Sequence, residues 1–207
     1  TFSYFYKKKD LLEVKSLTFT HEGQNQICFP DISLRNNEGL IVIGNSGSGK
    51  TTLINLIAGL IKPDSGDITL NQTKYNELSL DDLDIFRGKN IGLIFQKPHF
   101  IRNLNVLENL SLSTHLSRNK VRKMIFEETL SEVGLSEKVN VRPNELSEGE
   151  QQRLSIAMAL VKEPSIILAD EPTSSLDDNN CNKVINLLKS YSPVSYTHLT
   201  LPTSPKV

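Results

Sequence analysis

One stretch decides the predicted fold, Gly44-Asn45-Ser46-Gly47-Ser48-Gly49-Lys50-Thr51. It contains the P-loop pattern G-x-x-x-x-G-K-[ST], whose glycines let backbone N–H groups approach phosphate oxygens closely. The apolar run at 39–43 predicts a buried strand before it, and the apolar spacing at 53, 56, 57 and 60 predicts a helix after it. Because the pattern requires a strand and a helix on its two sides, we favour a phosphate site over a Gly/Ser loop that ends in Lys-Thr by chance.

The chemistry predicted for this stretch is the capture of phosphate groups. The N-terminus of the following helix adds partial positive charge. Lys50 would reach the β- and γ-phosphates, and the hydroxyl of Thr51 would hold Mg²⁺. We assign the nucleotide site to the loop and the residue that follows it: Gly44, Asn45, Ser46, Gly47, Ser48, Gly49, Lys50, Thr51 and Thr52.

Length, charge and cysteine content bound the class of protein. The chain has 207 residues, enough for one domain with an inserted lobe, and its 23 basic residues nearly balance 24 acidic ones. This balance argues against a nucleic-acid surface. Cys28 and Cys181 lie far apart without metal-binding spacing, which suits a reducing cytosol. No apolar run approaches about 18 residues, so we expect no membrane-spanning helix.

Two strands are predicted before the glycine-rich loop. Residues 11–20 alternate between polar and apolar, and Ile27–Leu34 follows as a second strand, in which Pro30 indicates an edge or a bulge. His21 comes directly after the first strand. Its ring could stack on an adenine, Phe19 is a rival for that role, and an ordinary exposed loop histidine is the alternative.

A helical lobe is predicted after the loop. Strands are expected at 66–70 and 90–95, with a short helix at 80–87 between them. Gln96 follows the second of these strands, and its amide could ligate Mg²⁺ or hold a water. The block 105–133 has helical spacing and no strand, which indicates a lobe inserted into an α/β core.

The run Leu146–Arg153 begins another predicted helix. Ser147 and Glu150 have the spacing of a capping box. The alternative is a second anion site, formed by the Ser147 hydroxyl, the Gly149 N–H and the helix N-terminus. Local physics alone favours the ordinary capped helix.

Two adjacent carboxylates, Asp170 and Glu171, end the apolar run at 165–169, which predicts a buried strand. Ligands of open α/β sheets bind at the carboxyl ends of strands. Asp170 would therefore hold Mg²⁺ through its water shell, and Glu171 would polarise the attacking water. Asp177 would cap a helix from about 178 to 190.

Taken together, these motifs resemble the nucleotide-binding subunit of ABC transporters, over residues 11 to about 190. Each motif has a counterpart in the family: Gly44–Thr51 in Walker A, Gln96 in the Q-loop, Leu146–Gln151 in the signature, Ile166–Glu171 in Walker B and Ser174–Asp177 in the D-loop. The signature is usually L-S-G-G-Q, and Glu148 here puts an acid where glycine is usual. Ser175 stands where the D-loop usually has alanine.

The resemblance implies an α/β fold of the P-loop NTPase type, with a RecA-like core, an antiparallel β subdomain and an inserted α-helical subdomain. The ATP-binding core would comprise 1–96 and 164–193, and the helical signature subdomain 97–163. ATP and Mg²⁺ would be the cofactors of an ATPase. The implied roles are catalysis by Lys50, Gln96 and Glu171, and metal binding by Thr51, Gln96 and Asp170. Nucleotide contacts outside the loop would come from His21, Ser147, Gly149, Glu150 and Asp177.

The resemblance also implies partners and a location. Two ATPase subunits would pair head to tail, with ATP between Walker A of one and the signature of the other. The pair would drive an integral membrane permease, and no nucleic acid would be bound. The chain would be cytoplasmic and peripheral on the inner face of the membrane, held there by the permease.

The subfamily and the rival functions differ in what they require. Asn90–Gln96 and Asn103–Asn109 resemble the lipoprotein-releasing and macrolide-export type, and the cell-division transenvelope ATPase shares the same motifs. A chromosome or DNA-repair ABC ATPase would carry a coiled coil or a basic surface. Glu171 argues against a regulatory module without turnover, and a P-loop kinase would not explain Leu146–Gln151.

Residues 194–207 do not fit the resemblance. The family has a further strand and then a switch histidine, and Thr197-His198 matches its usual pair, but no run of Val and Ile precedes it. Residues 194–203 can be read back as GTC TCT TAT ACA CAT CTG ACG CTG CCG ACG, which resembles a transposase adapter from sequencing-library preparation. We therefore expect natural sequence to stop near Pro193, His198 not to be catalytic, and this tail to supply no core strand. Such a chain would bind ATP but hydrolyse it poorly, and resequencing the locus tests this.

Overall fold

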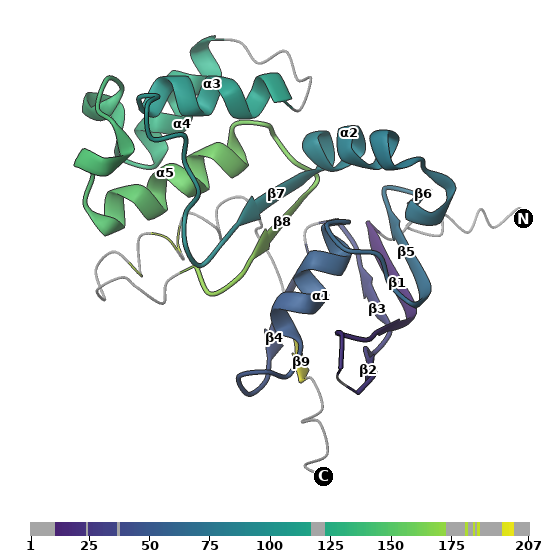
Figure 1. Cartoon of the computed structure of the whole chain (residues 1–207). Helices are drawn as coiled ribbons and strands as arrows, with labels where there is room; N and C mark the ends of the chain where they lie inside the picture. The colour runs from purple at the N-terminus through teal and green to yellow at the C-terminus, as the bar shows by residue number, and fades with distance from the viewer. Residues whose placement is uncertain are drawn as a thin grey trace, which may run out of the picture. The chain divides into compact units, whose positions relative to one another are not determined.

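The computed structural model describes residues 11–23, 25–36, 38–116, 123–172 and 196–200, together with Cys181, Val184 and Asn186. The chain divides into two compact units, coloured along the chain in Figure 1. The first unit comprises Thr1–Ser79 and Ser192–Val207, and the second comprises Leu80–Tyr191. The sequence instead groups 1–96 with 164–193, and that functional division stays a prediction.

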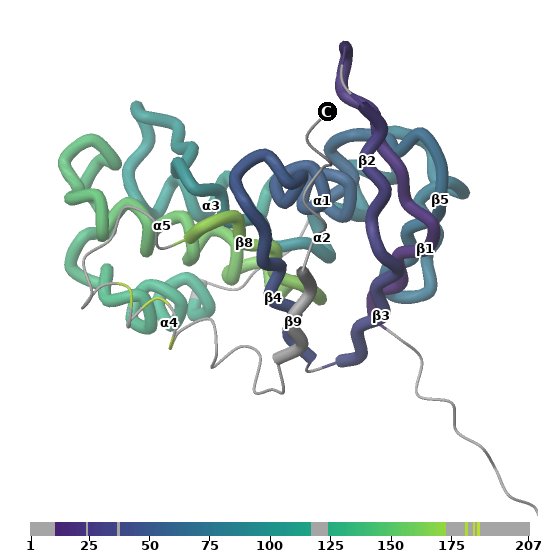
Figure 2. Tube along the Cα trace, turned by 90° about the horizontal axis from the view of Figure 1, so that it is seen from below, coloured from purple at the N-terminus to yellow at the C-terminus, as the bar shows by residue number. Residues whose placement is uncertain are grey.

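An antiparallel sheet built on one long strand forms most of the first unit. The strands are β1 (Leu12–Phe19), β2 (Ile27–Cys28), β3 (Ile32–Leu34), β5 (Ser65–Leu70) and β6 (Thr73–Lys74). Their order is β2-β1-β5-β6, with β3 also paired to β1, and Figure 2 shows β1, β2, β3 and β5 side by side. The strand prediction at 11–20 is confirmed, with Leu12, Val14 and Leu17 buried and the alternation interrupted at the exposed Ser16.

The single strand predicted at 27–34 is wrong, because the structure divides it into β2 and β3. Pro30 lies between the two and has no N–H to donate to a ladder. Opposite this break, the β1–β5 register shifts between Lys15 and Thr18. There the backbone N–H of Ser16 donates to Asp31 Oδ1 at 2.7 Å, so a side chain replaces the missing ladder bond.

Strand β4 (Gly39–Ile43) leads into the glycine-rich loop and pairs in parallel with β9 (Tyr196–Thr200). The prediction that 39–43 is a buried strand is wrong, since Ile41 is 41 % and Ile43 49 % exposed. A sheet of two strands leaves much of each strand uncovered. We expected the tail to supply no core strand, yet residues 196–200 do pair as a strand, because Tyr and Thr favour strands and a parallel ladder needs only backbone groups.

Helix α1 (Lys50–Ile57) follows the loop, as the apolar spacing predicts. Its apolar face buries Leu53, Leu56 and Ile57, whereas Leu60 lies beyond the last turn and is exposed. The hydroxyl of Tyr75, in the 3₁₀ turn Tyr75–Glu77, donates to the Ile57 carbonyl at 2.9 Å. That bond satisfies one of the carbonyls that a helix leaves unpaired at its C-terminal end.

In the second unit, two parallel strands lie side by side, β7 (Ile91–Ile94) and β8 (Ile166–Ala169). Helix α2 (Leu80–Asn90) precedes β7 and is three residues longer than predicted. Both strands were predicted, and β7 is mostly buried while β8 is half-buried. The Lys162 ammonium donates to the Ile91 carbonyl at 3.0 Å, and burial, helped by the Arg87 charge, lowers the pKa of Lys162.

Three helices build the lobe of the second unit, α3 (Val106–Leu116), α4 (Lys123–Glu132) and α5 (Glu148–Leu160). Two 3₁₀ turns, Ser136–Lys138 and Pro143–Glu145, connect α4 to α5. The buried core of the lobe consists of Val106, Leu110, Leu130, Val133, Leu135, Leu146, Leu154, Ala157 and Val161. The predicted helical block at 105–133 is confirmed as α3 and α4. Among the described residues, no helix has the length and apolar character to cross a membrane.

Candidate functional site

The glycine-rich loop turns sharply where α1 begins. Gly49 is the N-cap of the helix, with φ at 93°, a conformation that residues with a Cβ rarely adopt. A Cβ on Gly49 would lie 3.3 Å from Phe29 Cε1, so the loop also packs closely on the strand region beside it. The N–H of Ser48 donates to the Asn45 carbonyl at 3.2 Å and closes the turn. The loop therefore curls around the first N–H groups of α1, as phosphate binding requires.

Lys50 bends back over this loop. Its ammonium donates to the carbonyl of Gly44 at 2.9 Å and to the carbonyl of Asn45 at 3.0 Å. A cation is thereby fixed between the start of the loop and the N-terminus of α1. Both features attract an anion, since the helix end also carries partial positive charge.

Ser48 supplies the test of whether the loop fits a phosphate group. Its side chain is 7 % exposed, and within the described part of the chain its hydroxyl has no hydrogen-bond partner. Buried hydroxyls are nearly always paired, so this one marks the place of a polar group from outside the chain. A hydroxyl, a lysine and the N–H groups of a helix N-terminus are donors that a phosphate group accepts from. Thr51, on the first turn of α1, is exposed.

His21 lies against the helix that follows the loop. Its Nε2 is 3.0 Å from the hydroxyl of buried Thr52, and its ring meets that of Phe19 edge to face, with centroids 4.8 Å apart. The ring is half-buried, so the alternative of an ordinary exposed loop histidine is wrong. The contact with Thr52 places His21 beside the phosphate loop, and both rings stay candidates for stacking on adenine.

In the second unit, Gln96 and the carboxylates meet at the ends of β7 and β8. Gln96 Nε2 donates to Glu171 Oε2 at 3.4 Å, and the Asp170 N–H donates to the Ile94 carbonyl at 3.0 Å. The second bond extends the parallel ladder by one step and holds Asp170 at the strand end. Glu171 has φ at 46°, an uncommon conformation for this residue type that clusters at functional sites. The carboxylates therefore lie at the end of the strand as predicted, whereas the bond between Gln96 and Glu171 was not predicted.

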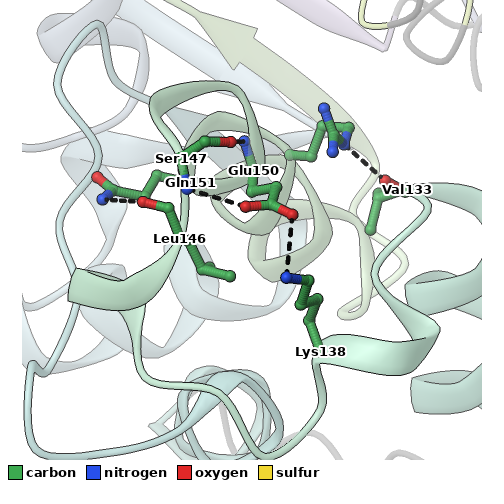
Figure 3. Close-up of polar contacts among 7 residues, drawn as sticks. Val133, Lys138, Leu146, Ser147, Glu150 and Gln151 are labelled. Carbon is green, nitrogen blue, oxygen red and sulfur yellow. Dashed lines mark hydrogen bonds and ion pairs between the residues drawn. The ribbon is translucent and has the colours of Figure 1, made fainter.

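The signature run begins α5 with a complete capping box, shown in Figure 3. The Glu150 N–H donates to Ser147 Oγ at 3.3 Å, and the Ser147 N–H donates to Glu150 Oε2 at 2.9 Å. Gln151 Nε2 donates to the Leu146 and Pro143 carbonyls at 3.1 and 3.0 Å. The capped helix is therefore confirmed, and the Ser147 hydroxyl keeps a lone pair and its proton for a second partner.

The Glu150 carboxylate is held by its own helix. Its hydrogen bond from the Ser147 N–H lowers the pKa of Glu150, and Lys138 Nζ, 3.6 Å from Oε1, acts in the same direction. Both interactions favour the ionised form. Glu150 therefore supports the fold of the signature, and its predicted contact with nucleotide remains a prediction. Gly149 lies in the first turn of α5, and Asp177 lies outside the described residues.

Two buried side-chain amides, those of Asn109 and Gln152, are not among the predicted site residues. Asn109 is 0 % exposed and bonds the loop before α3, whereas Gln152 is buried and neither amide atom has a partner in the described part of the chain. Asn109 ends the run Asn103–Asn109 that carries the subfamily resemblance, but no role was predicted for its side chain, and Gln152 has no motif signal of its own. A hollow of about 450 Å³ borders α4 and α5, and none of its described lining residues is a predicted site residue.

Comparison with known families and proteins agrees with this geometry. A family model described as "ABC transporter" matches residues 30–174. The lipoprotein-releasing system ATP-binding protein LolD of Wigglesworthia glossinidia brevipalpis is 38 % identical over 185 residues, which cover 86 % of this chain and 81 % of that protein. An uncharacterized ABC transporter ATP-binding protein of Mycobacterium tuberculosis is 36 % identical over 187 residues, covering 87 % and 75 %.

Solved structures show the same similarity. The dimeric structure of MJ0796, a bacterial ABC transporter cassette, has a TM-score of 0.79 and 33 % identity, and the match covers 92 % of this chain and 88 % of that one. A dimeric post-hydrolysis state of the same cassette, bound to ADP and Pi, has a TM-score of 0.78 with 33 % identity, over 93 % and 88 %. The present chain therefore shares the P-loop ATPase fold of these two solved cassettes.

Proposed function

Since the chain belongs to the ABC transporter family, as an ATP-binding subunit that hydrolyses ATP to power a membrane transporter, we propose that its transporter releases lipoproteins from the membrane. The observation that carries this proposal is the similarity to LolD over 81 % of that protein, whose name describes a lipoprotein-releasing system. Three further LolD proteins are 35–42 % identical over 163–186 residues. The glycine-rich loop and the strand-end carboxylates supply the ATPase chemistry that such a system requires.

In this proposal the first unit binds the nucleotide phosphates. The Lys50 ammonium, now on two loop carbonyls, is in place to exchange them for phosphate oxygens. The Ser48 hydroxyl and the N–H groups at the start of α1 complete the set of donors. His21 or Phe19 would support the adenine.

The carboxylates of the second unit would carry the hydrolytic step. Glu171 acts as the base that accepts a proton from the attacking water, and its bond to Gln96 holds the carboxylate in position. Thr51, Gln96 and Asp170 have oxygen atoms of the kind that Mg²⁺ prefers and would hold the ion. When bound, Mg²⁺ supplies positive charge that stabilises the phosphoryl oxygens.

The signature would act on the nucleotide of a second subunit. Ser147 lies at the N-terminus of a capped helix, so its hydroxyl and the partial positive charge of the helix end would together stabilise a bound anion. We propose a head-to-tail pair in which Ser147 contacts ATP held by the partner subunit. The pair would lie on the cytoplasmic face of the membrane, held there by the permease.

Mixing two inactive variants tests this action in trans. In a homodimer, either Ser147→Arg or Lys50→Ala blocks both ATP sites. In a heterodimer of the two variants, both substitutions affect the same ATP site and the other ATP site is intact. We expect the mixture to regain part of the ATPase activity that neither parent shows. Tag capture verifies that the heterodimer has formed. If one intact ATP site is sufficient for hydrolysis, an inactive mixture would refute action in trans.

A phosphate-release assay tests the transport function. We expect the purified chain to hydrolyse ATP slowly on its own, and to do so faster when reassembled with a permease partner. Phosphate release that the permease leaves unchanged would argue for an ATPase without a transport partner.

A further inference from the structure

Helix α5 packs on strand β7 with its N-terminus toward the carboxyl end of the strand. Just beyond the C-terminal end of the helix, the Lys162 ammonium bonds the carbonyl of Ile91, the first residue of β7. Closer to the middle of the helix, Ile156 belongs to the same buried cluster as Ile94, the last residue of β7. The order of these contacts means that helix and strand run antiparallel.

This packing places Gln152 at the level of the hydrolytic strand ends. Gln152 lies one helical turn before Ile156, which is about 6 Å along the helix axis. Two strand residues span about 6.6 Å, so the same distance beyond Ile94 leads to Gln96, which is bonded to Glu171. Helical side chains point toward the N-terminus of their helix, so the amide of Gln152 extends further in this direction.

The amide of Gln152 is buried without a hydrogen bond. Gln152 is 1 % exposed, and within the described part of the chain neither Nε2 nor Oε1 has a partner. The buried amide of Asn109, by contrast, bonds four backbone groups. A buried amide that loses water without gaining a partner destabilises the fold. The single chain therefore gives no reason for an amide at position 152.

The backbone of Glu171 supplies a second feature at the same level. Its φ of 46° lies in the left-handed region, which is unfavourable for glutamate and which clusters where segments switch conformation. A change of this φ turns the peptide groups on both sides of Glu171. The unpaired amide of Gln152 can accept from an N–H there or donate to a carbonyl.

We propose that Gln152 is a positioning residue for hydrolysis, whose amide bonds the backbone at Asp170–Glu171 once ATP binding has moved Glu171 out of its left-handed conformation. The proposal rests on the proposed function, in which Glu171 is the base, and adds the residue that holds the base in place. Ser147 and Gln152 lie five residues apart on one helix. The helix that contacts the ATP of the second subunit thus also orients the base for the ATP of its own chain.

The first test replaces Gln152 by methionine, which has nearly the same length and no amide. Thermal unfolding and phosphate release are measured on the full chain without permease. We expect Tm at or above the wild-type value, because an unpaired buried amide is removed. We expect kcat to fall about 3- to 10-fold, the effect of one neutral hydrogen bond, and KM for ATP to stay unchanged. Ser155→Ala, at a buried position on the same helix, is the control and should leave kcat unchanged.

Hydrogen exchange, read by mass spectrometry, tests the bond itself. In the Glu171→Gln chain, which retains ATP, we expect ATP to slow amide exchange in the peptide 166–172. In the chain that carries Glu171→Gln and Gln152→Met together, ATP should leave this exchange unchanged. A side chain that only fills space would not change the effect of ATP on backbone exchange.

Three results would overturn the inference. The first is wild-type kcat in a folded Gln152→Met chain, and the second is equal protection of 166–172 by ATP with and without the amide. If Gln152→Met does not fold, Gln152→Leu takes its place, and failure of both to fold would show that the single chain needs the amide. Wild-type hydrolysis by Glu171→Gln would refute the proposed function and the inference together, whereas wild-type kcat in Gln152→Met beside an inactive Glu171→Gln refutes the inference alone.

Discussion

Replacing Ser147 by alanine separates the two roles assigned to one hydroxyl. Among the described residues the hydroxyl accepts one bond, from the Glu150 N–H at 3.3 Å, at the N-cap of α5. Loss of such a cap costs about 1 kcal/mol. In a protein of this size, about 1 kcal/mol lowers Tm by roughly 2–4 °C. A protein stable by about 5–15 kcal/mol stays almost entirely folded after that loss, so the cap alone predicts unchanged turnover.

The proposed contact with the partner's ATP predicts a much larger effect of Ser147→Ala on turnover. A hydrogen bond to a charged group contributes about 1.5–3 kcal/mol. That energy corresponds to a loss of about 10- to 150-fold in ATP turnover. The assay pairs thermal unfolding with phosphate release by the chain without permease.

A second capping box in the same lobe supplies the control. At the start of α3, the Asn105 N–H donates to Glu108 Oε2 and the Glu108 N–H donates to Asn105 Oδ1, both at 2.8 Å. Asn105→Ala should lower Tm by a similar amount and keep basal turnover within about twofold, because it removes only a cap. Equal losses of turnover in Ser147→Ala and Asn105→Ala would show that Ser147 is no more than a cap.

Three further substitutions and one control have defined outcomes. Lys50→Ala should lower ATP turnover at least about 10²-fold and weaken ATP binding, since the phosphate charge loses its partner. Phosphate release at the wild-type rate would contradict the assignment of 44–51 as the phosphate-binding loop. Glu171→Gln should keep an acceptor for the Gln96 amide but lose the base. Size-exclusion chromatography with ATP should therefore show a trapped dimer. Hydrolysis at the wild-type rate would contradict the role of Glu171. Gly66→Ala should lower Tm by more than about 4 °C, because φ is 92° and a Cβ would lie 2.5 Å from the Ser16 carbonyl oxygen. Gly23→Ala, with φ at 71° and nothing within 4 Å of a Cβ, should cost less; an equal loss in both would contradict the steric argument.

Local sequence patterns predicted the parts of the site that depend on neighbouring residues. The capping box at Ser147 is confirmed because both partners lie within one helical turn. The strands β7 and β8 are confirmed because apolar runs mark both of them. Gln96 lies beside Glu171 because parallel strands end at the same edge of a sheet, although this contact was not itself predicted.

The parts that depend on distant residues could not be predicted. Pro30 indicated a break in the strand. Predicting that the Ser16 N–H bonds the Asp31 side chain in place of a ladder partner would require knowing how β1 pairs. The left-handed φ of Glu171 has no sequence signal, since glutamate rarely adopts it. Asn109 reads as one polar residue in a helix, and its role appears only when the loop 101–105 folds over it.

Burial was predicted least well. The apolar composition of 39–43 indicated a buried strand, yet burial depends on how many strands pair beside it, and β4 pairs with β9 in a sheet of two. The strand at Tyr196–Thr200 likewise shows that backbone pairing accepts many sequences.

The most direct test of the account measures lipoprotein release itself. Proteoliposomes holding the permease, this chain and a radiolabelled lipoprotein are given ATP, and the label that leaves the membrane is counted beside the phosphate released. The account predicts release that requires ATP, that rises with phosphate release and that Glu171→Gln abolishes. Rapid ATP hydrolysis stimulated by the permease with all lipoprotein left in the membrane would contradict it, as would equal release by the Glu171→Gln chain.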